Sequence, residues 1–391
     1  MANAVRDGVA RKRARMCGAV AAALAAAVLT GCTATGPASP VAQDGFGRTT
    51  RGVPLDRIAE EFRPLPGWGE DDHAGALAAF NHTCRWVNAQ APDRQLGSDP
   101  RAGTVAQWRP ACAVARSLPR DDAEAARTFF ESHFTPVSLS TGEDGLFTGY
   151  YEPELNGSWT RTARHTVPIY RTPPRPKGGY PSRARIAAGA LAGKGLEILW
   201  VDDPIGAFFM EIQGSGRVRM TDGTVVGLGY AGQNGHRYFP VGRELIDRGI
   251  ATPEEMSLQF IRRWMEANPA EAQKLKNLNP SYVFFKLRND GGARGARNME
   301  LTPGRSLAVD PAHVPLGAPL WVELKEAPVP GGEIRRLVVA QDTGGAIKGP
   351  VRGDLFWGVG PEAEEGAGLM KARGRYTMLV PRLILETAQN R

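Results

Sequence analysis

Three aspartates among the last hundred residues stand in glycine- or proline-rich segments beside runs of β-forming residues. They are Asp310 in Ala-Val-Asp-Pro, Asp342 in Ala-Gln-Asp-Thr-Gly-Gly and Asp354 in Arg-Gly-Asp-Leu-Phe-Trp-Gly. Loops at strand ends are where a rigid scaffold presents reactive side chains, and a glycine such as Gly344 lets a ligand approach the backbone closely. The alternative is that each aspartate bonds only the amides of its own turn. We favour that alternative for Asp310, with a supporting role at the site, because it precedes Pro311.

Asp342 and Asp354 are twelve residues apart, which leaves room for a turn and a short strand, so both carboxyls can face one cleft. A carboxyl partly buried against Phe356 and Trp357, and close to a second carboxylate, keeps its proton to a higher pH. A general acid that protonates a glycosidic oxygen needs this property. Lys348 lies between the two aspartates in the sequence and would instead favour an ionised neighbour. The sequence leaves open which effect prevails.

Two further segments contain residues suited to contacting a sugar or a peptide. Tyr150 and Tyr151 could offer a ring face to a sugar, although an aromatic residue in a strand is more often part of the core. Gln213, Gly214 and Ser215 follow a run of β-forming residues, in a glycine-rich loop. The side chains of that loop could hydrogen-bond sugar or peptide groups.

Several other chemistries find no support in the sequence. The Gly-rich loop at 214–216 lacks the length and the lysine of a phosphate-binding loop, and there is no Gly-x-Ser-x-Gly elbow. The six histidines are scattered, so we expect no metal and no cofactor. No basic helix, zinc knuckle or RNP-like motif indicates nucleic-acid binding.

The first 31 residues have the layout of a signal peptide, with a basic stretch before a short apolar run from Met16 to Leu29. Leu-Thr-Gly-Cys at 29–32 resembles a bacterial lipobox, which would make Cys32 the acylated first residue of the mature protein, followed by a tether at 32–50. The alternative is an ordinary secretory signal with a chance cysteine. Thr33 takes the place of the aspartate that would favour the inner membrane, so we expect a lipid anchor in the inner leaflet of the outer membrane, at its periplasmic face.

The formal net charge of +7 owes much to this targeting segment. Without residues 1–31, which hold five basic residues and Asp7, it falls to about +3 (7 − 5 + 1). A mildly cationic protein fits an anionic polymer as its substrate without requiring one. Cys84 and Cys112 then remain in a compartment that permits disulfides, either paired or as two buried thiols.

The 391 residues suffice for about two domains, and 47 glycines with 30 prolines favour short strands joined by turns. Helices are predicted after Asp71-Asp72, after Asp121-Asp122, and from Thr252, where Glu255 completes a capping box. A hairpin turn is predicted at 221–224. Strands are predicted at 147–151, 167–170, 198–201, 207–212, 224–230, 283–287, 306–309, 320–324, 337–341 and 376–380, with the three aspartates in loops.

Together these segments resemble the membrane-bound lytic murein transglycosylase A family from about Leu146 to Val380. The matching motifs are Phe-Thr-Gly-Tyr-Tyr-Glu-Pro at 147–153, Glu-Ile-Gln-Gly-Ser-Gly at 211–216, Gly-Tyr-Ala-Gly-Gln-Asn-Gly at 229–235 and Asn-Pro-Ser-Tyr-Val-Phe-Phe at 279–285. The three-aspartate region at 304–358 completes the resemblance. The segment before Asp354 departs from the family pattern, either by one extra residue or by the positive charge of Arg352.

The resemblance implies a mainly β fold with some helices, in two domains around a groove. The larger is a double-psi β-barrel from 51–152 plus 293–391, and the smaller is an inserted β-domain at 153–292. The implied reaction cleaves the β-1,4 bond between N-acetylmuramic acid and N-acetylglucosamine in peptidoglycan and closes a 1,6-anhydro ring. Asp354 matches the catalytic acid/base, Asp342 its partner, and Asp310 a structural member.

Two other functions remain open at this point. One is a peptidoglycan hydrolase, with Asp342 as base and Asp354 as acid. The other is a murein-binding lipoprotein without catalysis. We expect a monomer that acts on glycan strands, and the sequence does not say whether it joins a cell-wall synthesis complex.

Overall fold

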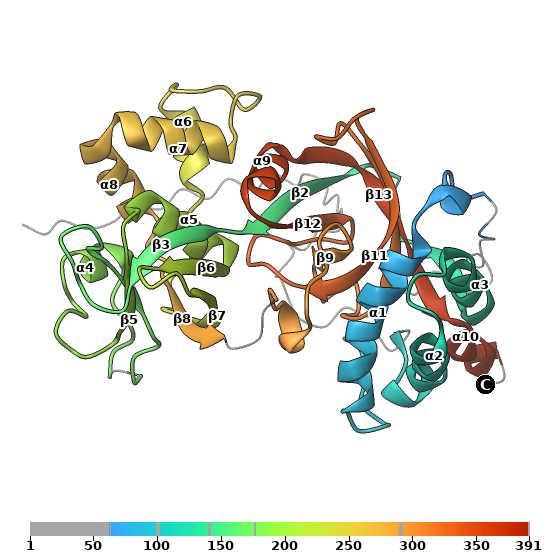
Figure 1. Cartoon of the computed structure of the whole chain (residues 1–391). Helices are drawn as coiled ribbons and strands as arrows, with labels where there is room; N and C mark the ends of the chain where they lie inside the picture. The colour runs from blue at the N-terminus through green and yellow to red at the C-terminus, as the bar shows by residue number, and fades with distance from the viewer. Residues whose placement is uncertain are drawn as a thin grey trace, which may run out of the picture. The chain divides into compact units, whose positions relative to one another are not determined.

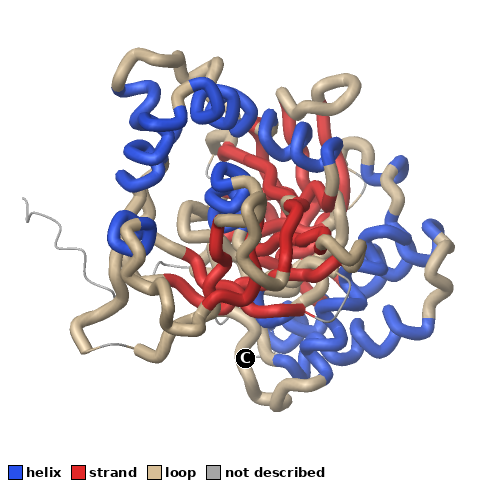
Figure 2. The backbone as a smooth tube through the Cα atoms, turned by 60° about the vertical axis from the view of Figure 1, so that its left-hand side comes forward, coloured by secondary structure: helices blue, strands red, loops and turns tan. Residues whose placement is uncertain are grey.

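The structure is a computed structural model, which describes residues 62, 64–98, 102–139, 142–175, 177–288 and 292–389. The predicted signal peptide, the tether and Cys32 lie outside the described residues. Within them, thirteen strands form two sheets accompanied by helices, so the mainly β fold is confirmed. In Figure 2 most of the helices lie toward the outside of the molecule, and the strands gather nearer its middle.

The first sheet closes on itself. Its strand order is β1-β13-β10-β11-β9-β12-β2, and β13 also pairs with β2, which makes a closed ring of six strands with β1 added to β13. This closed ring agrees with the barrel that the family resemblance implies. The strands are β1 Phe134–Ser138, β2 Gly145–Glu152, β9 Ser306–Val309, β10 Pro319–Lys325, β11 Glu333–Asp342, β12 Arg352–Val359 and β13 Lys371–Pro381.

Helices α1 His73–Asn88, α2 Val105–Ser117, α3 Ala123–His133 and α10 Arg382–Gln389 gather beside this ring in Figure 1. Asp72 caps α1 and Asp122 caps α3, each side chain accepting a backbone N–H, as the sequence predicts. Helix α2 was not predicted; it contains Pro110, a residue that disfavours the interior of a helix. Cys84 of α1 and Cys112 of α2 form a disulfide.

The second sheet has the strand order β4-β5-β3-β6-β7-β8. Its strands are β3 Glu154–Ser158, β4 Val167–Tyr170, β5 Glu197–Val201, β6 Ser215–Met220, β7 Val225–Gln233 and β8 Val283–Arg288. The predicted hairpin turn joins β6 to β7, with Gly223 at a positive φ of 84°. The first sheet therefore takes its strands from both sides of this stretch of sequence, which supports the predicted domain division. That division and the groove stay predictions.

The helices beside the second sheet are α4 Arg183–Ala187, α5 Pro204–Gln213, α6 Val241–Asp247, α7 Leu258–Ala267 and α8 Pro269–Leu278, and α9 Pro361–Leu369 packs on β2 and β12. The strand predicted at 207–212 is wrong, because this segment is part of α5. Asp203 accepts the N–H groups of Ile205 and Gly206, and Pro204 is the first helical residue. A short apolar run does not separate strand from buried helix by its periodicity.

The helix predicted from Thr252 starts later in the structure. The capping-box hydrogen bonds between Thr252 and Glu255 do form, but they close a single turn. The continuous helix α7 begins at Leu258, where Ser257 accepts the N–H of Phe260. The sequence therefore indicated the right local bonds and the wrong first residue.

A buried ion cluster joins the two sheets where β2 ends. Glu152 is fully buried, and its carboxylate accepts from Arg217 Nε at 2.8 Å and from Arg288 Nη2 at 2.6 Å. Arg288 reaches it by crossing β7 at two glycines. A Cβ on Gly227 would lie 3.0 Å from Arg288 Nε, and one on Gly229 would lie 2.9 Å from its Cδ. The glycines therefore leave the path that Arg288 needs.

We predict that Glu152→Gln lowers the free energy of unfolding by about 3 kcal/mol or more, because it leaves a buried guanidinium without its counter-charge. Denaturant unfolding followed by tryptophan fluorescence measures this. The matched control is Glu154→Gln, which breaks the exposed 2.7 Å pair with Arg219 and should cost at most about 1 kcal/mol. Equal losses in the two variants would contradict a special role for the buried cluster.

Candidate active site

Asp342 and Asp354 stand in one row across neighbouring strands. Asp354 of β12 pairs in register with Thr148 of β2 on one side and with Ala308 of β9 on the other. Ala308 pairs in turn with Asp342, the last residue of β11, after a register shift at this strand end. Residues in register on adjacent strands point to the same face, so the two carboxyls flank Ala308 with their Cα atoms about 10 Å apart.

This row lies on the face of the sheet that points away from the main barrel core. Leu307 and Leu355, the neighbours of Ala308 and Asp354, belong to the main core cluster. Ala308 and Phe356 belong instead to a small separate cluster with Tyr150, Ala293 and Leu301. The two acids therefore border a compact apolar patch, and both side chains remain partly exposed. Asp342 ends a strand and Asp354 lies within one, so the prediction that both stand in loops is wrong.

Asp354 keeps its proton to an unusually high pH. Burial raises the pKa of its carboxyl to about 6, against the opposing effects of the Thr148 hydroxyl and the Arg352 guanidinium. Thr148 Oγ1 donates to Asp354 Oδ1 at 2.6 Å, and Arg352 Nη2 donates to Thr148 Oγ1 at 2.9 Å. Because Arg352 donates to the oxygen of the Thr148 hydroxyl, the proton of that hydroxyl points to Oδ1 of Asp354. Among the described residues no hydrogen bond to Oδ2 is found, so this oxygen can carry a proton.

Asp342 has a similar pKa for a similar reason. Burial and, to a smaller extent, the charge of Asp354 raise the pKa of its carboxyl to about 6, against the opposing effects of the Thr343 N–H, the Tyr150 hydroxyl and the Ala296 N–H. These N–H groups donate to Oδ1 at 2.8 and 3.0 Å. The segment with Ala296 comes this close because Gly295 has no side chain: a Cβ there would lie 2.5 Å from the Gln341 carbonyl oxygen.

Both tyrosines of the Tyr-Tyr motif are core residues. Tyr150 is 9% exposed, and burial together with the charges of Asp342 and Asp354 raises the pKa of its phenol well above its usual value. The Tyr150 hydroxyl lies near enough to Asp342 for each group to shift the pKa of the other. Among the described residues, however, no partner of this hydroxyl has the geometry of a hydrogen bond. Tyr151 is 2% exposed and packs against Ala363 and Ala367. Neither ring offers an open face to a sugar.

Asp310 has the contacts of a turn-stabilising carboxylate. Burial alone would raise its pKa, but the N–H groups of Gly349 and Ala312 hold the pKa below its usual value. They donate at 2.9 and 3.1 Å. The Lys348 ammonium lies 3.9 Å from the Asp310 carboxylate. Its charge therefore acts on Asp310 and not on Asp342 and Asp354, although it lies between those two in the sequence. Gly344 lies in the same connection, where a Cβ would meet Ile347 at 2.8 Å.

The Gln-Gly-Ser segment of the second sheet comes close to this row. Gln213 is the last residue of α5, Gly214 ends the helix at a φ of 81°, and Ser215 begins β6. The Oε1 atom of Gln213 accepts the backbone N–H of Tyr151 at 3.1 Å, three residues after Thr148. Glu211, predicted in a strand, is instead a buried helical residue bound to Arg183 at 2.9 Å.

The residues that the sequence reasoning missed are Thr148, Arg352 as its partner, Ala308, and the Gly295-Ala296 segment. Only Thr148 carried a usable signal, because it stands two residues before Tyr150 and so shares its face of a strand. The others act through register or backbone atoms, which the sequence does not reveal.

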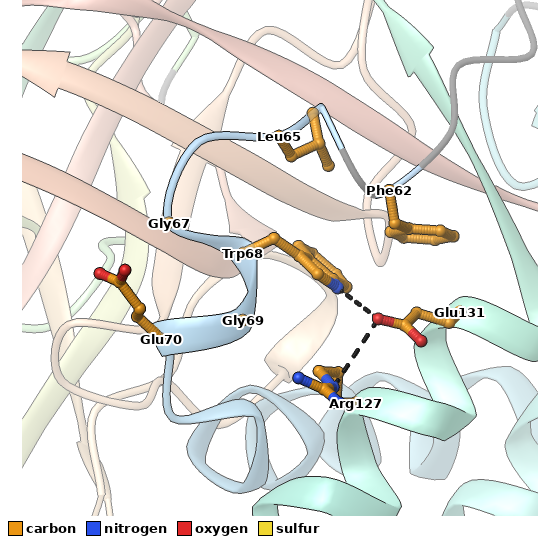
Figure 3. A pocket seen from close by; sticks show the side chains of 8 residues that line it. All are labelled: Phe62, Leu65, Gly67, Trp68, Gly69, Glu70, Arg127 and Glu131. Atoms are coloured by element: carbon orange, nitrogen blue, oxygen red, sulfur yellow. Dashed lines mark hydrogen bonds and ion pairs between the residues drawn. The ribbon is translucent and has the colours of Figure 1, made fainter.

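A hollow of about 610 Å³ lies elsewhere, beside the helices of the first sheet (Figure 3). Trp68 Nε1 donates to Glu131 at 2.8 Å, Arg127 lies 3.8 Å from the same carboxylate, and the ring of Phe62 stands beside the indole. None of the predicted site residues lines this hollow.

Within the described residues no group of three or more His, Cys, Asp or Glu side chains is placed to hold a metal ion. The carboxylate row remains our candidate site.

Two family models match the chain. One, described as the MltA specific insert domain, matches residues 146–286, and the other, described as the 3D domain, matches residues 305–380. The first contains Thr148 and the Gln-Gly-Ser segment. The second contains all three aspartates.

The chain is also similar to solved structures along nearly their whole length. A membrane-bound lytic murein transglycosylase from Agrobacterium tumefaciens is 34% identical with a TM-score of 0.77, and the match covers 84% of this chain and 99% of that one. The chain belongs to the membrane-bound lytic murein transglycosylase A family.

Other members of this family extend the comparison. The Escherichia coli protein with bound chitohexaose is 33% identical with a TM-score of 0.65, over 80% of this chain and 90% of that one. Membrane-bound lytic murein transglycosylase A of Escherichia coli K12 is 41% identical over 239 residues, which is 60% of this chain. That match spans 65% of the relative's own length.

The raised pKa of Asp354 predicts a pH-dependent effect of Asp354→Asn on stability. The folded-state pKa is raised from 3.8 to about 6, so stability that is present below about pH 4 is lost as pH rises through 6. Asparagine keeps the Thr148 bond and carries no charge. The variant should match the parent at pH 4 and exceed its free energy of unfolding by up to about 3 kcal/mol at pH 8.

Denaturant unfolding at both pH values measures this difference. Asp93→Asn, at an exposed position outside the row, is the control and should show little pH dependence. A destabilisation by Asp354→Asn of the same size at pH 4 and pH 8 would contradict the proposed cost of the buried charge.

Proposed function

We propose that this protein is a lytic transglycosylase of the bacterial cell wall. It cleaves the β-1,4 bond between N-acetylmuramic acid and N-acetylglucosamine and leaves a 1,6-anhydromuramoyl end. The observation that carries the proposal is the partly exposed Asp354, whose pKa is raised to about 6 beside a second carboxyl. A relative of the same family has been crystallised with chitohexaose, a chain of β-1,4-linked sugars of the same type.

One carboxyl suffices for this reaction, because the attacking hydroxyl is already part of the substrate. Asp354 gives its proton to the oxygen of the leaving N-acetylglucosamine as the C1–O bond breaks. The C6 hydroxyl of the muramoyl residue then attacks C1, and its proton passes to the Asp354 carboxylate. The acid is regenerated, no water is consumed, and the two products together have the mass of the substrate.

Asp342 tunes the acid in this proposal. The two carboxyls lie on the same face, and the charge of Asp354 raises the pKa of Asp342, so the pair resists carrying two negative charges at once. Gln213, Gly214 and Ser215 contact the sugar next to the cleaved bond, since the backbone of Tyr151 holds this segment close to the row. Asp310 and Lys348 hold the connection between the two acids in place.

Membrane association belongs to the proposal as well. The relatives are named membrane-bound, and acylated Cys32 would supply an anchor at the periplasmic face of the outer membrane. Among the helices that the structure describes, none combines the length and the apolar character that crossing a bilayer requires.

The test digests purified murein sacculi and weighs the released muropeptides by mass spectrometry. We expect muropeptides lighter by one water than their reducing-end equivalents. Asp354→Asn should reduce their release by about 100- to 10,000-fold, the usual contribution of an acid/base group. Asp93→Asn serves as the control and should behave as the parent does.

Each contrary result has a definite meaning. Reducing-end products would show that water is the attacking group and would identify a hydrolase. If the sacculi stay intact with the parent and with every variant, the protein binds murein without cleaving it. Anhydro products from Asp354→Asn at the parent rate would remove Asp354 from the mechanism.

A further inference from the structure

A second cavity, of about 810 Å³, lies in the part of the chain that forms the second sheet. It is lined by residues between Pro173 and Leu196 and by His236, and by none of the predicted site residues. Its volume is within the range of about 300–1,000 Å³ that is usual for ligand pockets. The space is more than a single small ion requires.

The charges around this cavity are all positive. Lys177, Arg185 and Lys194 line it, and no aspartate or glutamate does. Within the described chain, none of these three side chains forms an ion pair or a hydrogen bond. Another exposed arginine beside the same sheet, Arg164, is paired with Asp202 at 2.8 Å. The cavity therefore holds three cations without counter-charges.

Hydrogen bonds fix one wall of the cavity. The Tyr180 hydroxyl donates to the Pro173 carbonyl at 3.0 Å, and the His236 ring nitrogen Nε2 lies 3.0 Å from the Tyr180 carbonyl oxygen. Asn234 donates to the carbonyl of Pro181 at 3.0 Å. The cavity thus has a wall held together by its own contacts, together with cations that are free to bind a ligand.

The rest of the lining is apolar. The rings of Pro173, Pro174 and Tyr180 and the side chains of Leu191 and Leu196 face the same space. A ligand that matches both features carries several negative charges on a body that is partly apolar. A short acidic peptide has this composition, whereas an inorganic anion lacks the apolar part.

We propose that this cavity binds the carboxylate-bearing peptides attached to the glycan strand. This inference rests on the proposed function, because it assigns a second contact to the same polymer. A strand held both at the carboxylate row and through a peptide binds more tightly than either contact alone allows. Strands with peptides are therefore bound more tightly than strands without them.

The test compares binding of two glycan preparations to the full chain in detergent, carrying Asp354→Asn so that strands stay intact. One preparation retains its peptides, and the other has lost them to an amidase. Lys177→Gln/Arg185→Gln/Lys194→Gln should weaken binding of peptide-bearing strands about tenfold or more and leave peptide-free strands unaffected. Arg116→Gln/Arg120→Gln/Lys325→Gln removes the same charge from exposed positions outside the cavity and should change neither.

Three results would overturn the inference. In the first, every variant binds both preparations equally. In the second, the control variant loses as much binding to peptide-bearing strands as the cavity variant does. In the third, the cavity variant loses binding to anionic phospholipid vesicles but keeps its binding to peptide-bearing strands. The last result would assign the cavity to lipid headgroups. The two proposals fail separately. Absence of anhydro products with Asp354 present overturns the proposed function, whereas cleavage without any preference for peptide-bearing strands overturns the peptide site.

Discussion

The free-energy cost of holding two carboxyl groups out of bulk water is the constraint on which this site depends. Burial raises the pKa of both Asp342 and Asp354 to about 6, and the surrounding strands make that burial tolerable. Thr148 donates to one carboxyl and two backbone N–H groups donate to the other, so each remains bonded when ionised. Ala308 between them is small enough to leave both accessible. The barrel thus supplies an acid that is half-ionised near pH 6.

The second sheet completes the site through a few contacts at the end of β2. Tyr151 holds Gln213 by a backbone hydrogen bond, and the next residue, Glu152, binds Arg217 and Arg288. These contacts fix the Gln-Gly-Ser segment relative to the carboxylate row. A single strand therefore contributes Thr148 to the acid, Tyr150 to the patch beside it, and the attachment of the proposed sugar-binding segment.

Sequence patterns predicted the elements whose signals are local. Asp72 and Asp122 cap their helices, and most of the predicted runs are strands of the structure. Helix α5 was mistaken for a strand because its apolar run is too short to show a period. The motifs also led us to predict Asp342 and Asp354 as the acids, which stays a prediction, but they did not reveal the structural setting of the two carboxyls. The pairing of Asp354 with Thr148 joins residues 206 positions apart, and no local pattern encodes such a register.

The most direct test of this account is the titration of the Asp354 carboxyl itself, followed by NMR of protein with carboxyl-labelled aspartate. We predict two carboxyl signals that titrate near pH 6, one of which disappears in Asp354→Asn and the other in Asp342→Asn. If every aspartate signal instead titrates near pH 4, the strands do not hold the carboxyls away from water, and the proposed acid has no proton to give at neutral pH.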